Sequence, residues 1–226
     1  MAIMINQDVR TNIMKNRFLK NDLKSYLIIF ICGMIVGIAT RLTDFFKADT
    51  LWSFSSIATL FGFWIICVAG IVLFSSSNLC AGISSFLYMF GMTFSFYSLQ
   101  YVLGLFLPMF DNEGFKTSLF LLYSFLSIGC GMGAFILYYW ERKTKISAVL
   151  YALPVGALVA ETIGIGICLV NRSVFLFQFL LDFLAFILLG TIFYKRTVSK
   201  VIYGVAICLV TAAVYFIVYQ PFLYLV

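Results

Sequence analysis

Histidine is missing from the 226-residue chain, and charged residues are scarce. Without histidine the protein has neither a Ser-His nor a Cys-His nucleophile, and no His-based zinc protease site. The sequence also contains no Gly-x-Ser-x-Gly elbow and no Walker loop for phosphates. A hydrolase with this sequence would therefore need unusual machinery.

The cysteines give little support to redox or zinc chemistry. There are six of them, none in a Cys-x-x-Cys pair, and each falls in a different predicted helix. Metal and redox motifs need two or more such ligands close together. We therefore expect the cysteines to act as small packing residues, and we expect no metal centre and no cofactor.

The low charge content also excludes an ordinary soluble domain. Charged residues make up 11% of the chain, and hydrophobic residues make up 63%. A soluble globular domain has roughly 25% charged residues. With a mean hydropathy of +1.07, the composition predicts an all-α integral membrane protein with the lipid bilayer as its main partner.

Seven long apolar stretches are candidates for membrane spans. A helix needs about 20 mostly apolar residues to cross the hydrocarbon core. The stretches cover residues 23–42, 51–74, 80–107, 117–140, 146–170, 173–194 and 201–220. The gaps between them are short, so we expect one transmembrane helical bundle over residues 23–226. Residues 1–22 are expected to form a basic, amphipathic segment at an anionic cytoplasmic leaflet.

The distribution of Lys and Arg predicts the orientation. With seven spans, one side of the membrane carries 11 basic residues and the other carries 4. Without the first span the division becomes 9 to 6, a weaker bias. The positive-inside rule thus favours seven spans, a cytoplasmic N-terminus and an external C-terminus.

The loops and the N-terminal segment account for the net charge of +6, so we expect no nucleic-acid partner. Arg41, directly after the first apolar run, argues against a cleaved signal peptide.

Small residues repeat at helical spacing in several spans. Helices in lipid associate through close approach at such residues. The fifth span carries the longest stripe, and shorter ones occur in the first and fourth spans. The residues are Ala152, Gly156, Ala160, Gly164, Gly33, Gly37, Gly129 and Gly133. We expect them to pack against other helices of the same chain, with docking of another membrane subunit as the alternative.

Glu161 and Asp182 are the only acids deep within predicted spans. Placing such a residue at a helix centre costs about 2.5–3.5 kcal/mol. A tight turn predicted near Asn171 and Arg172 separates the two spans, and each acid lies 10.5 positions from its centre. An antiparallel hairpin would therefore hold both acids at one level, about 15 Å from the outer turn.

Two other polar residues are candidates for the same centre. Gln178 lies four residues before Asp182 and therefore on the same helical face. Arg41, at the outer end of the first span, is a possible charge partner. Facing carboxylates in a low dielectric cannot easily both be ionised, so at least one is expected to hold a proton unless a cation binds between them. The alternative is structural, with each acid bonded to a backbone group or a hydroxyl.

Four stretches carry a resemblance to known proteins. They are RLTDFF at 41–46, LWSFSSIATLFGFW at 51–64, SSSNLCAGISSFLYMFGMTFSFY at 75–97 and ALPVGALVAETIGIGI at 152–167. The chain resembles a family of small bacterial multi-spanning membrane proteins known only as a domain of unknown function. The resemblance implies a bacterial cytoplasmic membrane location, and it implies that Glu161 in VAETIG and Asp44 in TDFF are family features. It brings no activity, substrate or catalytic residue.

Three functions fit these observations. The favoured one is transport, with a small-solute or cation or proton site at Glu161, Asp182 and Gln178. The second is an accessory or substrate-binding subunit of a larger membrane complex. The third is an intramembrane enzyme that uses the carboxylates as acid and base, although no motif supports it.

Overall fold

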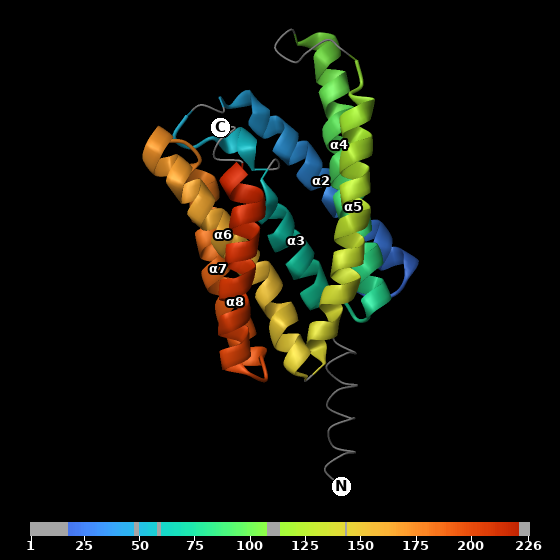
Figure 1. Cartoon of the computed structure of the whole chain (residues 1–226). Coiled ribbons are helices and arrows are strands. Elements are labelled where there is room, and N and C mark those ends of the chain that lie inside the picture. The colour runs from blue at the N-terminus through green and yellow to red at the C-terminus, as the bar shows by residue number, and fades with distance from the viewer. Residues whose placement is uncertain (1–17, 48–49, 58–59, 108–113, 143, 222–226) are drawn as a thin grey trace. The chain divides into compact units, whose positions relative to one another are not determined.

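The computed structural model describes residues 18–47, 50–57, 60–107, 114–142 and 144–221 (Figure 1). Most of the amphipathic segment predicted for residues 1–22 lies outside the described residues. All regular elements of the described part are helical, as the sequence predicts. They are α2 (Leu23–Leu42), η1 (Thr43–Phe45), η2 (Phe54–Ser56), α3 (Phe61–Phe74), α4 (Asn78–Phe106), α5 (Thr117–Leu137), η3 (Tyr138–Glu141), α6 (Lys145–Arg172), α7 (Leu176–Arg196), α8 (Lys200–Val214) and η4 (Tyr215–Tyr219).

Six helices of the described chain are long and apolar enough to cross a membrane. They are α4, α6 and α7, together with α2, α5 and α8, each counted with the helical turn that continues it, η1, η3 and η4 respectively. Their length and composition make the protein compatible with a multi-pass membrane location. The stretch 51–74, predicted as one long span, differs. Its helix α3 has 14 residues, which corresponds to about 21 Å and falls short of a hydrocarbon core about 30 Å thick.

A turn interrupts the stretch 51–74 before α3 begins. Ser53 has a left-handed backbone, with φ at 44°, and the short turn η2 follows it. A residue with a side chain in this conformation interrupts a right-handed helix. The sequence around it is as apolar as a continuous span, so hydropathy alone does not reveal the interruption.

Contacts between Cα atoms divide the chain into two compact units. One contains residues 1–37 and 68–138, and the other contains residues 38–67 and 139–226. Helices α2 and α3 contribute to both. In the first unit, α4 and α5 form a closely packed hairpin.

Gly33 and Gly37 allow α2 to approach α4 closely within the first unit. A Cβ atom added at Gly33 would lie 2.2 Å from the carbonyl oxygen of Tyr88, and one added at Gly37 would lie 2.2 Å from that of Met92. The Ser95 hydroxyl donates a hydrogen bond across the same contact to an α2 carbonyl, at 2.8 Å. The expected packing role of these two glycines is therefore observed.

The expected packing role of Gly129 and Gly133 is not observed. Among the described residues, no atom lies within 4 Å of a Cβ added at either position. Gly131 meets α4 instead, because a Cβ there would lie 3.0 Å from the carbonyl oxygen of Gly82 and 3.0 Å from Cβ of Phe86. Residues two positions apart lie on different helical faces, so the prediction chose the wrong face of α5.

We expect Gly131→Val to destabilise the protein and Gly129→Val to leave its stability nearly unchanged. Valine at position 131 must displace the α4 backbone, and overpacking of this kind costs about 1–3 kcal/mol. Valine at position 129 enters open space. Thermal unfolding of the two purified variants in detergent compares them directly, and equal losses would contradict this assignment of the α5 faces.

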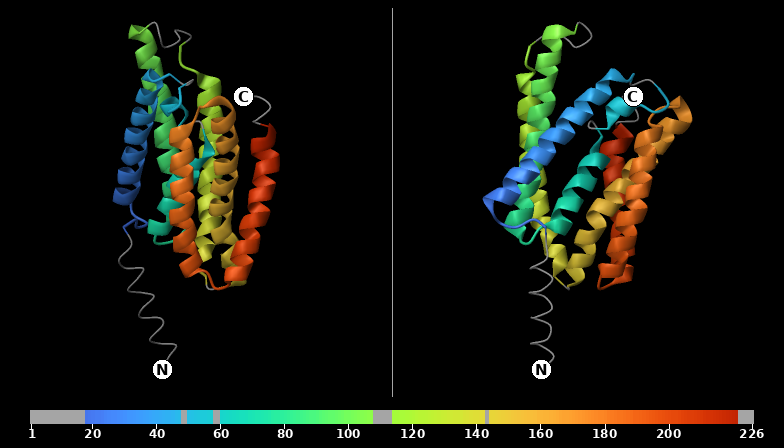
Figure 2. Two further views of the ribbon diagram at one scale, coloured as in Figure 1. Left: turned by 90° about the vertical axis from the view of Figure 1, so that its left-hand side faces the viewer. Right: turned by 180° about the vertical axis from the view of Figure 1, so that it is seen from behind.

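In the second unit, α6 packs against both α7 and α8, and the three helices lie side by side (Figure 2). The small residues of α6 form the contact with α8. A Cβ added at Gly156 would lie 2.8 Å from Cβ of Val210, and the Thr211 hydroxyl donates to the Gly156 carbonyl at 3.1 Å. Ala152, Gly156, Ala160 and Gly164 are all buried, as an intramolecular packing stripe requires.

The turn between α6 and α7 lies slightly later than predicted. It covers residues 173–175, with Ser173 and Phe175 in left-handed conformations. The segment before α3 is bonded to this turn. The N–H of Phe175 donates to the Ser53 hydroxyl at 3.2 Å, and the N–H of Leu176 donates to the Leu51 carbonyl at 2.9 Å. The interrupted part of the second predicted span is thus fixed to one end of the α6–α7 hairpin.

Candidate functional site

The three polar residues predicted for the centre of the bundle come together in the second unit. Glu161 lies on α6, whereas Gln178 and Asp182 lie one turn apart on α7. Their exposed fractions are 0%, 1% and 0%. An ionisable side chain removed from water in this way is costly unless donors or charges compensate it, so the partners of the two acids decide what the site can do.

The amide of Gln178 bridges the two acids. Its Nε2 donates to Oδ1 and Oδ2 of Asp182, at 2.9 and 3.0 Å. The same nitrogen lies 3.5 Å from Oε1 of Glu161, a long contact. The spacing of four residues between Gln178 and Asp182 accounts for the first pair of contacts. The contact with Glu161 shows that both carboxyl groups reach the same point.

Glu161 receives two further donors from outside the α6–α7 hairpin. The Tyr219 hydroxyl donates to Oε2 at 2.6 Å. The backbone N–H of Gly62 lies near the Glu161 carboxyl group and is directed at it. Gly62 is the second residue of α3, where backbone N–H groups have no partner within the helix and the helix dipole is positive. The late start of α3 therefore directs a helix N-terminus at a buried acid.

Glycine at position 62 is required by its neighbour on α7. A Cβ added there would lie 2.0 Å from Oδ1 of Asp182. The α3 backbone thus touches one acid while its N–H is directed at the other. Nothing in the sequence signals this contact, because Gly62 lies inside an apolar run and has no side chain from which a role could be inferred.

Tyr219 is positioned by a local change in helix α8. The helix ends in a π-helical turn, Tyr215–Tyr219, a wider turn that often occurs at functional sites. Gly164 on α6 makes room for the ring, since a Cβ added there would lie 3.0 Å from Cβ of Tyr219. In the sequence, nothing distinguishes Tyr219 from the other hydroxyl-bearing residues of the last span, such as Thr211 and Tyr215. Its spacing from the glycine and from Glu161 becomes visible only in three dimensions.

The cluster has no basic partner in the described part of the chain. No Lys or Arg among the described residues forms an ion pair with Glu161 or Asp182. Gln178 Oε1 is also buried and accepts no hydrogen bond from the described residues. The acids are compensated only by an amide, a phenol and a backbone N–H. Glu161 has donors from three elements, whereas Asp182 has one, from its own helix.

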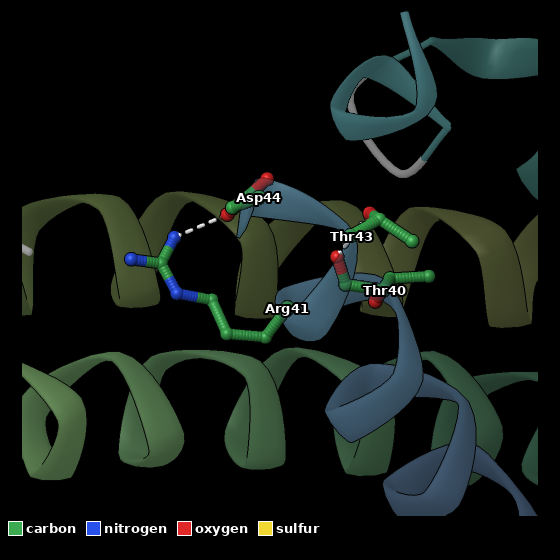
Figure 3. A network of polar contacts seen from close by, with 4 residues as sticks. All are labelled: Thr40, Arg41, Thr43 and Asp44. Carbon is green, nitrogen blue, oxygen red and sulfur yellow. Dashed lines mark hydrogen bonds and ion pairs between the residues drawn. The ribbon is translucent and has the colours of Figure 1, made fainter. Parts of the chain in front are cut away.

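Arg41 was a possible partner of these acids, and the structure pairs it with a different one. Its Nη1 donates to Oδ2 of Asp44 at 2.5 Å (Figure 3). The Thr43 hydroxyl donates to the Thr40 carbonyl at 2.6 Å and fixes the same turn. This ion pair is local, because an acid three residues away on a helical turn is within reach of Arg41 without any tertiary contact. Asp44 belongs to the TDFF sequence that the resemblance singles out.

No group of three or more His, Cys, Asp or Glu side chains able to hold a metal ion occurs in the described ranges. Comparison with protein-family models, with curated proteins and with solved structures found no match. The resemblance to the bacterial family therefore stays a prediction.

Proposed function

We propose that the chain crosses the membrane seven times, with the N-terminus in the cytoplasm and the C-terminus outside. The second crossing would comprise residues 51–74, of which only α3 is a long helix. A contact at its end supports this, since Leu19 donates to the Phe74 carbonyl at 3.2 Å and accepts from the N–H of Ser76 at 3.1 Å. The end of α3 thus lies beside the start of α2. The chain that leaves the far end of α2 therefore returns, through residues 51–74, to the end of α2 from which it started. The bias of basic residues supplies the orientation.

We infer that the protein is transport-related and exchanges a proton at Glu161 and Asp182. One observation carries this proposal: two wholly buried acids from different helices contact the same amide nitrogen, with no basic partner among the described residues. Intramembrane acids in such surroundings are costly and mark ion or proton pathways. Because two adjacent carboxylates in a low dielectric repel each other, a proton shared by the pair is the simplest compensation.

The arrangement of the donors favours a proton over a metal ion. A hard cation needs oxygen atoms directed at it. Here the Gln178 nitrogen, the Tyr219 hydroxyl and the Gly62 N–H all direct hydrogen at the carboxyl groups. Such donors occupy the lone pairs that a metal ion would use. A carboxyl group can still take up and release a proton within this arrangement.

A second candidate is a non-catalytic accessory subunit of a membrane complex. Its support is the burial of the cluster, which lets Glu161 serve as a polar contact joining α3, α6, α7 and the end of α8. In that case the acids stabilise the bundle and move nothing. The two functions differ in the effect expected from neutral substitutions of Glu161 and Asp182. Such substitutions abolish proton flux if the protein is a transporter, and an accessory subunit has no proton flux to lose.

We expect Glu161→Gln and Asp182→Asn to abolish solute-driven proton movement in proteoliposomes. The vesicles would contain a pH-sensitive dye, and amino acids, sugars and organic acids would be added outside in turn. A solute that changes the internal pH with the wild-type protein should give only the response of protein-free vesicles with either variant, because an amide cannot exchange the proton.

The matched control is Glu141→Gln, which neutralises an acid outside the cluster. Glu141 lies 3.8 Å from Nη1 of Arg196, with which it forms an ion pair. Its flux should equal that of the wild type. Full flux in both cluster variants would reject the proton site. Absence of any solute response, together with co-purification of another membrane subunit, would favour the accessory function.

A further inference from the structure

The end of α8 is attached to the second unit by few contacts besides those with α6. Much of the helix is exposed, including Val205 at 56%, Leu209 at 67% and Ile217 at 74%. Its last turn, by contrast, buries Tyr219, which is 3% exposed. A helix with one buried anchor near its end can change its local conformation when that anchor is released.

The anchor is the hydrogen bond between Tyr219 and Glu161. The residues around it are arranged for this bond: Gly164 leaves space for the ring, and the π-helical turn places the hydroxyl 2.6 Å from Oε2. A π turn is rare and less favourable than the α-helix it interrupts. The bond to the acid is therefore a reason for the turn to persist.

The strength of this bond depends on the charge of Glu161. Hydrogen bonds to an ionised carboxylate are roughly twice as strong as those between neutral groups. The groups that face Glu161 are Gln178 and Asp182 from α7, the Gly62 N–H from α3 and Tyr219 itself. Of these, only Asp182 is an acid, and it opposes a negative charge on Glu161. A proton on Glu161 relieves that repulsion and weakens the bond from Tyr219.

We propose that Tyr219 is a positioning residue that couples protonation of Glu161 to the conformation of the end of α8. With Glu161 ionised, the hydroxyl holds residues 215–219 in the π turn against α6. With Glu161 protonated, the weaker bond lets this turn open or revert to α-helix, which moves the end of α8 relative to α6. The inference rests on the proposed proton site and adds the element that responds to it.

Hydrogen exchange of residues 215–221 in the full-length protein, reconstituted in lipid nanodiscs, tests the coupling. Protection, corrected for the intrinsic exchange rate at each pH, should be about tenfold higher at mildly alkaline than at mildly acidic pH in the wild type. Glu161→Gln should show the low protection at both pH values. Tyr219→Phe should do the same, because its ring still packs against Gly164 but has no hydroxyl.

Tyr215→Phe is the matched control, since it removes a hydroxyl from the same π turn without touching the Glu161 bond. It should retain the pH dependence of the wild type. If wild-type protection does not change with pH while solute-driven proton flux needs Glu161, this inference fails and the proposed function stands. If protection changes with pH but no flux is found, the coupling stands and the transport function fails. A Tyr219→Phe protein that keeps the full pH dependence would also overturn the inference.

Discussion

Replacing Gly62 with alanine is expected to destabilise the protein. The new Cβ would lie 2.0 Å from Oδ1 of Asp182, a carboxyl group already held on both oxygens by Gln178. Either α3 or the acid must shift, and overpacking of a buried site costs about 1–3 kcal/mol. A shift of α3 also moves the Gly62 N–H away from the Glu161 carboxyl group.

The measurement is thermal unfolding of the purified protein, where each kcal/mol corresponds to roughly 2–4 °C in Tm for a chain of this size. Gly70→Ala is the control, because Gly70 lies in the same helix with no described atom within 4 Å of an added Cβ. Alanine is the better helix former by about 1 kcal/mol, so this variant should be as stable as the wild type or more stable. Equal losses in the two variants would show that Gly62 does not touch the acid cluster.

Hydropathy and spacing were sufficient to predict the helices and part of the site. Six predicted spans correspond to helices of membrane-crossing length. The acids stood out because an apolar background makes each buried carboxyl group conspicuous. Gln178 followed from helical periodicity alone, since a residue four positions before Asp182 lies on its face. These predictions needed only local sequence and the thickness of the membrane.

The remaining partners depend on features that hydropathy does not record. The left-handed backbone of Ser53 and its bond to the α6–α7 turn interrupt the stretch 51–74, which hydropathy alone predicts to be one continuous span. Tyr219 depends on the rotation of α8, which the π turn changes locally. The wrong choice of Gly129 over Gly131 has the same origin, because the rotation of α5 decides which glycine meets α4.

Asp182→Asn is expected to raise stability while it abolishes transport. Asp182 is wholly buried, and within the described residues it has one hydrogen-bond donor and no basic partner. Asparagine has nearly the same shape, keeps an acceptor for Gln178 and removes the cost of a buried charge. The penalty for burying an ion is several kcal/mol, so its removal should outweigh the weaker hydrogen bonds of the amide. The gain should be largest at alkaline pH, where the pair carries the most negative charge.

Glu161→Gln should behave in the opposite way. Tyr219 donates a hydrogen bond to Glu161, and the Gly62 N–H is directed at the same carboxyl group. A glutamine side chain has no charge, so it accepts a weaker bond from Tyr219. Its NH2 group is itself a donor and cannot accept a bond from the Gly62 N–H. We therefore expect a Tm above the wild type for Asp182→Asn and below it for Glu161→Gln, measured by thermal unfolding at the same alkaline pH. Asp182→Ala serves as the control for shape, since it leaves a cavity and a buried amide without its acceptors. Its Tm should fall. A lower Tm in both isosteric variants would mean that the two acids are compensated alike, and that Asp182 is a structural acid whose charge the fold requires.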